Sequence, residues 1–353
     1  MTTKLSKTPL DIAATVVAYN ITHTHMVAAD ARGTVAVWCR PDPPCGPASW
    51  EKIASWTAVG NSAVSCLCWS PPEFGNVVCG GTVSGSVCFW SQDGQTGQWS
   101  LRTCIHACGK LATCAAFGPA VFGPWVAVGF GDGSVRVYEA SSTLNAKSWE
   151  LHSSLQLERF PTYTTTVPTC SVTSVSWRNE QDDCPPLLAV GTSSEAFPCE
   201  IWMFSQDRLL WEQVNRLGVH DLTDVMEDGD NNGTISDSRD RNGNNASGQT
   251  ATVAAWAPTL GRPVELLAVA SGNLVTLWSL QGQADSLQVK RVAGLEHKHA
   301  VWQLEWNMLG NFLAASTDGG DVCLWRPDFA GEWVLQSKIC ADDTSARETM
   351  NTE

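Results

Sequence analysis

The sequence is poor in long apolar runs and in basic residues. No run approaches the roughly 18 apolar residues that a membrane-spanning helix needs, and the opening MTTKLSKTPL lacks the apolar core of a secretory signal. Lysine and arginine number 22, against 36 aspartates and glutamates, which gives a formal net charge of -14. Binding to nucleic acid or to an anionic membrane needs a basic surface. We therefore expect a soluble protein with no transmembrane segment and no direct nucleic-acid partner.

Motifs that carry chemistry are also missing. The sequence contains no G-x-S-x-G nucleophile turn, no P-loop and no G-x-G-x-x-G. Cys66-x-Cys68 and His297-x-His299 lack the further ligands that a four-ligand zinc site requires. We predict that the protein is not an enzyme, and that it has no catalytic residues, no cofactor and no metal site.

One acidic tract, 219–250, has too few apolar residues to fold alone, and we expect a disordered loop there. Its residues 228–235 match the first half of an EF-hand calcium loop. Position twelve of that loop is Arg239, where a bidentate glutamate is needed. We therefore do not expect the segment 228–239 to bind calcium.

Cysteine, by contrast, is plentiful. The 14 cysteines are spread through a sequence with no secretory signal, so we expect a reducing compartment in which disulfides are rare. Many of them lie inside strand-like runs, where they are interpreted as small buried hydrophobes: Cys66, Cys68, Cys79, Cys88, Cys114 and Cys323.

A pattern of four short apolar runs recurs six times along the chain. The opening runs lie at 13–20, 63–70, 111–118, 171–177, 251–256 and 300–306. The third runs end in an aromatic residue and lie at 33–38, 85–90, 133–138, 199–204, 273–278 and 320–325. Fourth runs, which often open with tryptophan, include 50–56, 99–104, 149–155, 211–217 and 333–339.

Each run has the length, the apolar content and the flanking turn residues of a β-strand. No stretch shows a 3.6-residue period over helical length, so the fold is predicted to be all-β. Four short strands in a recurring unit predict a β-propeller blade, because stacked blades bury each other's faces in a ring. Asp132-Gly133 and Asp318-Gly319 are expected to supply the positive φ of tight hairpin turns.

We therefore predict one propeller domain over 13–340. Its six blades are expected near 13–57, 63–106, 111–157, 171–217, 251–293 and 300–339. The third strands resemble those of WD-repeat proteins, although the aspartate of the WD dipeptide is missing after most of them. His297 resembles the conserved histidine of that family, which implies a structural hydrogen-bond network with Asp318.

The predicted strands come in complete sets of four, and neither terminus offers a spare strand to close the ring. The N-terminal tail 1–12 contains Pro9, which weakens strand pairing, and the C-terminal tail 341–353 is polar. An open propeller would expose unpaired edges and apolar faces, which proteins rarely leave bare. A partner that adds strands in trans is the expected solution.

The segments 70–78, 135–140, 256–270 and 301–325 resemble the Seh (Sec-thirteen homologue) nucleoporin family. This resemblance implies a six-bladed open propeller in the Y-shaped scaffold of the nuclear pore complex at the nuclear envelope. It also implies partners: an α-solenoid nucleoporin that inserts a blade, and other Y-complex nucleoporins, in support of protein and mRNA transport. The alternative is a WD-repeat adaptor of a vesicle coat in the cytoplasm, or of a nutrient-sensing complex at the vacuolar or lysosomal membrane.

The best physical estimate of the partner-binding residues places them on the edge strands of the first and last blades. On blade one these candidates are Val16, Val17, Val35 and Val37. On blade six they are Leu304, Val322 and Leu324.

Overall fold

The structure, a computed structural model, describes residues 10–40, 50–141, 148–157, 170–179, 184–194, 197–218, 252–259, 264–282 and 287–340. The predicted acidic loop 219–250, with the calcium-like segment 228–239, lies outside these residues. So do residues 1–9 of the predicted N-terminal tail and the tail 341–353. No helix in the described ranges is long and apolar enough to cross a membrane.

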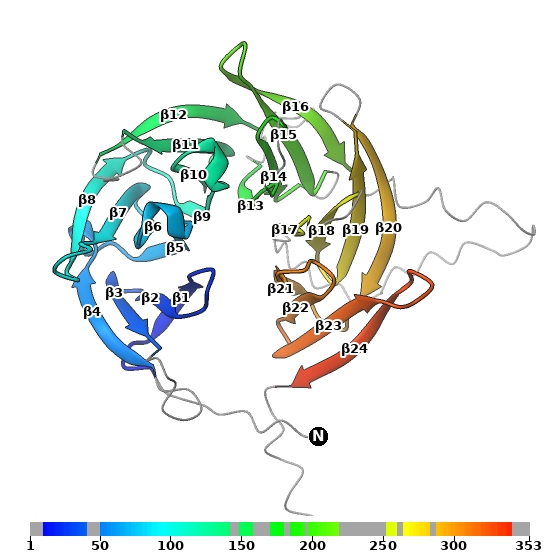
Figure 1. The fold of residues 1–353 in the computed structure, drawn as a ribbon, viewed down its shortest axis with the longest axis horizontal. Helices are drawn as coiled ribbons and strands as arrows, with labels where there is room; N and C mark the ends of the chain where they lie inside the picture. Colours follow the sequence, from blue (N-terminus) through cyan, green and yellow to red (C-terminus); the bar gives the residue numbers. More distant parts are fainter. Residues whose placement is uncertain are drawn as a thin grey trace, which may run out of the picture.

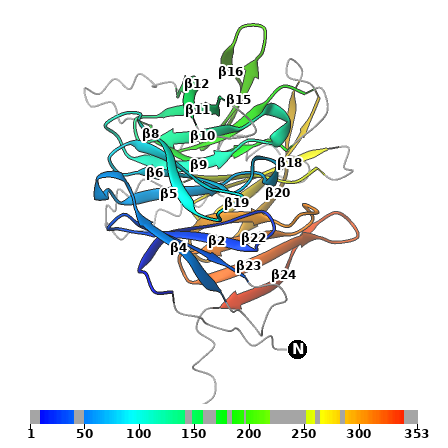
Figure 2. The same cartoon turned by 60° about the vertical axis from the view of Figure 1, so that its left-hand side comes forward.

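The described strands form six antiparallel sheets of four, arranged around a ring as the blades of a propeller (Figure 1; Figure 2). Blades one to three contain β1 (Ala14–Tyr19), β2 (His25–Asp30), β3 (Thr34–Cys39), β4 (Glu51–Thr57), β5 (Val64–Trp69), β6 (Val77–Thr82), β7 (Ser86–Gln92), β8 (Trp99–His106), β9 (Ala112–Phe117), β10 (Trp125–Phe130), β11 (Ser134–Ala140) and β12 (Trp149–Gln156). Blades four to six contain β13 (Val172–Trp177), β14 (Leu187–Thr192), β15 (Cys199–Ser205), β16 (Leu210–Leu217), β17 (Thr252–Trp256), β18 (Glu265–Ser271), β19 (Leu274–Gln281), β20 (Gln288–Glu296), β21 (Val301–Trp306), β22 (Leu313–Thr317), β23 (Asp321–Pro327) and β24 (Trp333–Cys340). The six-bladed, all-β fold predicted from the repeats is confirmed.

The central strands are apolar on both faces because both faces are covered. Every residue of β6, β10 and β14 is buried, whereas a sheet with one wet face would alternate buried and exposed positions. The cover comes from the neighbouring blades, since five of the hydrophobic clusters each span two consecutive sheets.

The third strand of each blade shows which face meets which neighbour. In β7, Val87 and Phe89 pack against blade three, while Cys88 and Trp90 pack against blade one. The closing aromatic residue of a third strand therefore faces the preceding blade, and the alternate positions face the following blade. Trp278 and Leu277 of β19 obey the same rule, toward blades four and six respectively.

Indole groups tie several inner strands to the preceding blade. The Nε1–H groups of Trp69, Trp177 and Trp306 each donate to a backbone carbonyl of the preceding inner strand, at 3.0 Å. Their acceptors are Ala18, Ala116 and Ala255 respectively. These hydrogen bonds are partly buried, so losing the donor leaves a partly desolvated carbonyl without its partner.

Hydroxyl groups make the reciprocal tie toward the following blade. A β-bulge interrupts the pairing of the first two strands at Ser65 and at Thr173. Ser65 Oγ donates to the carbonyl of Ala112, at 2.5 Å, and Thr173 Oγ1 donates to that of Thr252, at 2.6 Å. Both acceptors belong to the next inner strand.

Two expectations about local structure need correction. Gly133 has the predicted positive φ, 82°, but in the corresponding turn of blade six the positive φ is at Gly320, 76°, and not at Gly319. The glycine that closes the turn, whose N–H donates to the carbonyl of Thr317, is the residue that must enter the left-handed region.

The second correction concerns His297. Its Nε2 accepts a hydrogen bond from Trp325 Nε1, at 3.1 Å, and its Nδ1 lies 3.1 Å from the carbonyl oxygen of Leu295. Asp318 is not among its hydrogen-bond partners, because the indole of Trp325 already occupies Nε2. The ring is a fold residue, as predicted, but it joins the third strand of blade six to the end of β20.

We expect replacement of Trp177 by Phe to lower the free energy of unfolding by about 1–3 kcal/mol, because the carbonyl of Ala116 loses its donor. Urea denaturation would measure the change. Trp302→Phe, at an exposed indole, should stay within about 0.5 kcal/mol of the parent protein. Equal losses for the two variants would contradict the tie.

Stability should fall as pH decreases through the range in which His297 titrates. Burial lowers the pKa of His297 below its ordinary value of 6.5. Between the two pKa values the unfolded chain binds more protons, so the native state loses free energy as the pH falls through that window. We expect the urea midpoint to drop between about pH 7.5 and about pH 5.5. The drop should be smaller for His297→Asn, which retains an acceptor but does not titrate.

Candidate docking surface at the ring opening

The ring of blades is not closed by a shared sheet. In the described residues each sheet contains only consecutive strands, and none combines strands from the two ends of the chain. Consecutive inner strands pack in the order β1, β5, β9, β13, β17 and β21, while β21 and β1 make no comparable contact. Blade one and blade six, blue and orange in Figure 1, thus flank an opening.

Blade six presents to this opening an apolar face that no other part of the described chain covers. By the register rule, Val322 and Leu324 of β23 face a following blade, as Val275 and Leu277 of β19 do. The two blade-five residues are fully buried, at 0% exposure, but Val322 and Leu324 are only half-buried. Ile339 of β24, paired with Val322, is 41% exposed.

The inner part of this face is polar. Glu305 of β21 is opposite Ala314 of β22. The equivalent residue on the inner strand of blade five is Ala255. The Glu305 carboxylate accepts a hydrogen bond of 2.6 Å from Gln303 Nε2. The face therefore combines an apolar outer region with a negatively charged inner edge.

Trp302 is the bulge residue of β21, at the position that faces the following blade in other blades. The bulge residues of blades one to four are Thr15, Ser65, Thr113 and Thr173, all small and hydroxyl-bearing. In blade six the same bulge position holds Trp302, whose side chain is 55% exposed. A large, exposed indole thus holds the position from which Ser65 and Thr173 bond to the next inner strand.

The opposite wall, on blade one, is already partly covered. Met26, Ala28, Ala36 and Trp38 form a buried cluster on the face toward the opening. Leu10, Ile12 and Trp50 pack over this cluster. Residues 10–12 of the predicted tail are therefore part of the wall, and they lie there without forming a strand.

A salt bridge supports this cover. Asp11 Oδ2 lies 2.8 Å from Lys52 Nζ, and Lys52 Nζ lies 5.9 Å from the ring centroid of Trp38. The hydrogen bond from Lys52 lowers the pKa of Asp11. Both groups are solvent-exposed enough that the pair orients the segment more than it stabilises it.

The two walls approach each other at their inner strands. Tyr19 of β1 holds the register position of Trp69 and Trp306 and so faces the opening, where it is 46% exposed. Burial, and then the negative charge of Glu305, raise the pKa of Tyr19. Tyr19 and Glu305 are thus near enough across the opening to interact electrostatically.

The structure divides the predicted partner-binding residues between two locations. Val17, Val322 and Leu324 lie on the faces toward the opening. The others pack inside the ring: Val16, Val35 and Val37 toward blade two, and Leu304 toward blade five. Successive residues of a strand alternate faces, so the odd-numbered valines of β3 face blade two and Ala36 and Trp38 face the opening.

The sequence-based estimate also missed residues that do line the opening. Trp302, Tyr19 and Ile339 were not selected. A signal for Trp302 was present, because it replaces the threonine or serine of the other opening runs. Of the unpaired edges and apolar faces that the sequence led us to expect, the described residues place sheet faces at the opening. A partner must therefore cover faces.

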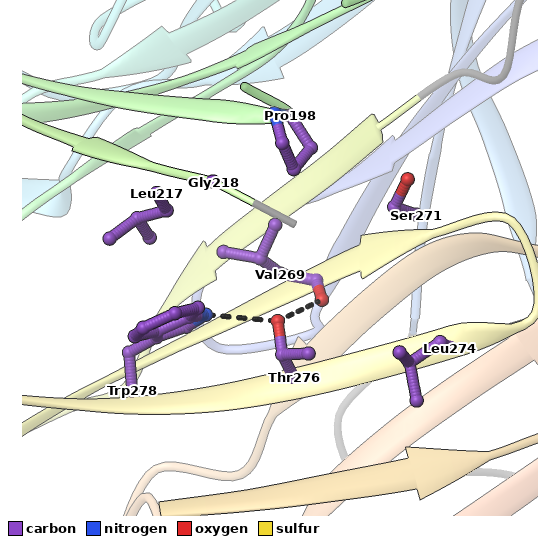
Figure 3. A pocket seen from close by; sticks show the side chains of 8 residues that line it. All are labelled: Pro198, Leu217, Gly218, Val269, Ser271, Leu274, Thr276 and Trp278. Atoms are coloured by element: carbon purple, nitrogen blue, oxygen red, sulfur yellow. Dashed lines mark hydrogen bonds between the residues drawn. The ribbon is translucent and has the colours of Figure 1, made fainter. Parts of the chain in front are cut away.

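Elsewhere, an apolar cavity of about 110 Å³ lies between blades four and five. Figure 3 shows Trp278 Nε1 donating to Thr276 Oγ1, at 2.9 Å, and Thr276 Oγ1 donating to the carbonyl of Val269, at 3.2 Å. The cavity volume is below the ~300 Å³ at the lower end of small-molecule sites.

Comparisons with known proteins give a consistent picture. No family model matches the chain. The chain is 26% identical to Protein SEH1 of Arabidopsis thaliana over 346 residues, covering 95% of this chain and 98% of that protein. It is 26% identical to nucleoporin seh1 of Drosophila melanogaster (88% and 80% covered) and 24% identical to nucleoporin SEH1 of Homo sapiens (90% and 82% covered).

Solved structures share the fold alone. The crystal structure of a protein from Lactobacillus plantarum superposes with a TM-score of 0.64 at 12% identity, covering 93% of this chain and 84% of that one. Sqt1 of Saccharomyces cerevisiae gives a TM-score of 0.60, also at 12% identity, covering 94% and 76%.

Equivalent leucines in blades five and six should respond differently to truncation. Leu277→Ala should cost about 2–5 kcal/mol of unfolding free energy, because it opens a cavity in a covered face. Leu324→Ala in the isolated chain should cost about 1 kcal/mol, since its face has no cover. Urea denaturation of both variants tests this, and a cost at Leu324 as large as at Leu277 would mean that the face is buried.

Proposed function

The chain is a WD-type propeller related over most of its length to the SEH1 nucleoporins, and we propose that it is a structural scaffold subunit of the nuclear pore complex. In this role it belongs to the Y-shaped coat at the nuclear envelope and supports the transport of protein and mRNA. It acts through its surfaces and performs no chemistry. The observation that carries the proposal is the uncovered face of blade six, on a chain whose named relatives are nucleoporins.

The opening is suited to a seventh sheet supplied by another chain. In blade five, Val275, Leu277 and Leu295 are buried against blade six. Val322, Leu324 and Ile339 hold the corresponding positions of blade six, with no described sheet over them. Full burial of one such side chain contributes about 1.5–3 kcal/mol. A sheet that covers all three would therefore gain several kcal/mol from this wall alone.

The inner strand of such a sheet must meet Trp302 and Glu305. A small residue opposite Trp302 would leave room for the indole, and its backbone carbonyl could accept the indole N–H, as the carbonyls of Ala112 and Thr252 accept from hydroxyls. A basic or hydrogen-bond-donating side chain would complement Glu305. We propose that an α-solenoid nucleoporin carries this sheet as a blade inserted in trans.

The proposal is tested by affinity capture of the tagged full-length chain from its own cells, followed by mass spectrometry. We expect nucleoporins with long helical-repeat regions in stoichiometric amounts, and a nuclear-envelope rim when the chain is fluorescently labelled. Capture without such nucleoporins would contradict the proposal. So would residence at endoplasmic-reticulum exit sites or on the vacuolar membrane in place of the rim.

Substitution in the opening should separate docking from folding. Leu324→Asp should reduce capture of the α-solenoid nucleoporin at least tenfold, because a charge on the covered face opposes burial. Leu151→Asp is the matched control: Leu151, on β12, is 52% exposed on the outside of blade three. Equal capture by both variants, with each folded by circular dichroism, would place the docking surface elsewhere.

A further inference from the structure

One cross-strand position recurs in every blade, just before the bulge between the third and fourth strands, and it faces the preceding blade. Its six pairs are Ala36–Ser55, Cys88–Cys104, Arg136–Ser154, Glu200–Arg216, Thr276–Gly294 and Cys323–Lys338. The backbone geometry is shared, while the side chains differ from blade to blade. The two backbone positions are equivalent in every blade, so the interaction made there depends on which two side chains the blade carries.

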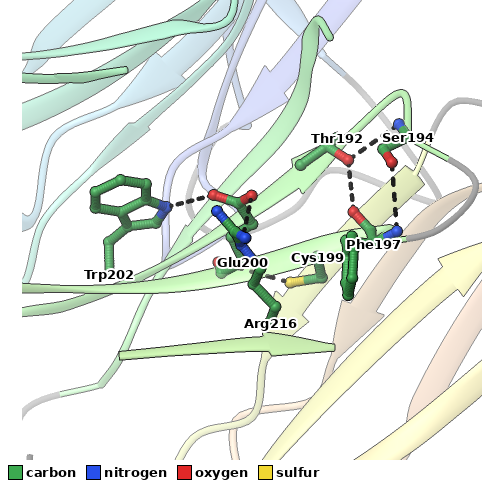
Figure 4. A network of polar contacts seen from close by, with 7 residues as sticks. All are labelled: Thr192, Ser194, Phe197, Cys199, Glu200, Trp202 and Arg216. Carbon is green, nitrogen blue, oxygen red and sulfur yellow. Dashed lines mark hydrogen bonds and ion pairs between the residues drawn. The ribbon is translucent and has the colours of Figure 1, made fainter. Parts of the chain in front are cut away.

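Blade four shows that the two side chains at this position reach each other. Arg216 Nε lies 3.4 Å from Glu200 Oε1, and both side chains are largely buried. Figure 4 shows this ion pair together with Trp202 Nε1, which donates to Glu200 Oε2 at 3.0 Å. The cross-strand pair is thus a point of direct side-chain contact.

Blade two places two thiols at the same point. Cys88 and Cys104 are directly opposite in the β7–β8 ladder, and their Sγ atoms are 2.7 Å apart. Directly opposed residues of an antiparallel pair have Cα atoms about 4.5–5.5 Å apart, which lies within the 4.4–6.8 Å range of disulfides. A bond between the two sulfurs therefore needs little movement of the backbone.

The two thiols also differ in a way that suits oxidation. Cys88 is fully buried, whereas Cys104, on the outer strand, is partly exposed. The hydrogen bond from Cys88 lowers the pKa of Cys104, while the same contact and burial raise the pKa of Cys88. The accessible sulfur is thus the one that ionises first, and the thiolate is the reactive form of cysteine.

We propose that Cys88 and Cys104 are a site of reversible disulfide formation by a peroxide. The Cys104 thiolate attacks one oxygen of hydrogen peroxide and the O–O bond breaks. This yields a sulfenic acid and hydroxide, which takes up a proton to become water. Cys88 then attacks the sulfenic sulfur, its proton leaves with the hydroxyl group as a second water, and the S–S bond forms. Two thiols are oxidised, one peroxide is reduced, and a thiol reductant reverses the change.

The bond would form at the interface between blades one and two. Cys88 and Cys104 belong to the cluster that packs against Val27, Val35 and Val37 of blade one. Cross-linking β7 to β8 closes the intervening chain in the unfolded state, which should raise the thermal stability of the oxidised form. The site is remote from the wall of blade six and independent of the proposed partner.

Counting thiols in the full-length chain tests the proposal. The reduced protein is exposed to equimolar hydrogen peroxide, unfolded, and labelled with N-ethylmaleimide before intact-mass measurement. We expect two fewer adducts than the 14 cysteines, and full labelling after dithiothreitol. A protein that keeps all its adducts, or one whose loss dithiothreitol does not restore, would overturn the assignment.

Variants identify the pair. Cys104→Ser should label at all of its remaining thiols after peroxide, because the sulfur that attacks the peroxide is missing. Cys88→Ala should lose at most one adduct, because Cys104 can form a sulfenic acid but has no second sulfur with which to form a disulfide. Cys108→Ser is the matched control, since Cys108 is a partly exposed cysteine four residues from Cys104, and this variant should still lose two adducts. If Cys104→Ser also loses two, another pair is responsible. That variant decides the question even if the buried Cys88→Ala fails to fold.

Discussion

The structure depends on one constraint: a blade is stable only when both faces of its sheet are covered by other sheets. Central strands such as β6, β10 and β14 have no wet face, since all of their residues are buried. A ring of blades meets the constraint for every sheet with two neighbours. Six blades around an unclosed ring leave two faces without one, and every functional argument about this chain follows from those two faces.

The ties between blades give the ring a direction. Indole N–H groups donate to the preceding blade, as Trp69 does to Ala18, and bulge hydroxyls donate to the following blade, as Ser65 does to Ala112. At the opening neither kind of hydrogen bond can form within the described part of the chain, because blade one has no preceding blade and blade six has no following blade. Tyr19 holds the position of the backward donor and Trp302 that of the forward donor, on the two blades that each lack one neighbour.

Much of this architecture could be predicted from the sequence. The aromatic-closed runs ending at Trp90 or Trp325 located the third strands, and the complete sets of four indicated an open ring. Composition does not show which residues of β3 face the opening and which face blade two, because Val35 and Val37 are as apolar as Ala36 and Trp38. Deciding between them needs the register rule, which comes from seeing Cys88 and Trp90 against blade one. The packing of Leu10 and Ile12 on blade one was equally hidden, because three residues carry no periodic signal.

The cover that Leu10, Ile12 and Trp50 give to blade one has a consequence for biosynthesis. Blade one leaves the ribosome before the blades that follow it, and exposed apolar sheet faces on a nascent chain invite aggregation. Because these residues cover one face of blade one, that face is already protected from solvent while the following blades are synthesised. Blade six is synthesised after the other five and has no such lining among the described residues. Its apolar face is therefore exposed from the time of its synthesis until a partner binds.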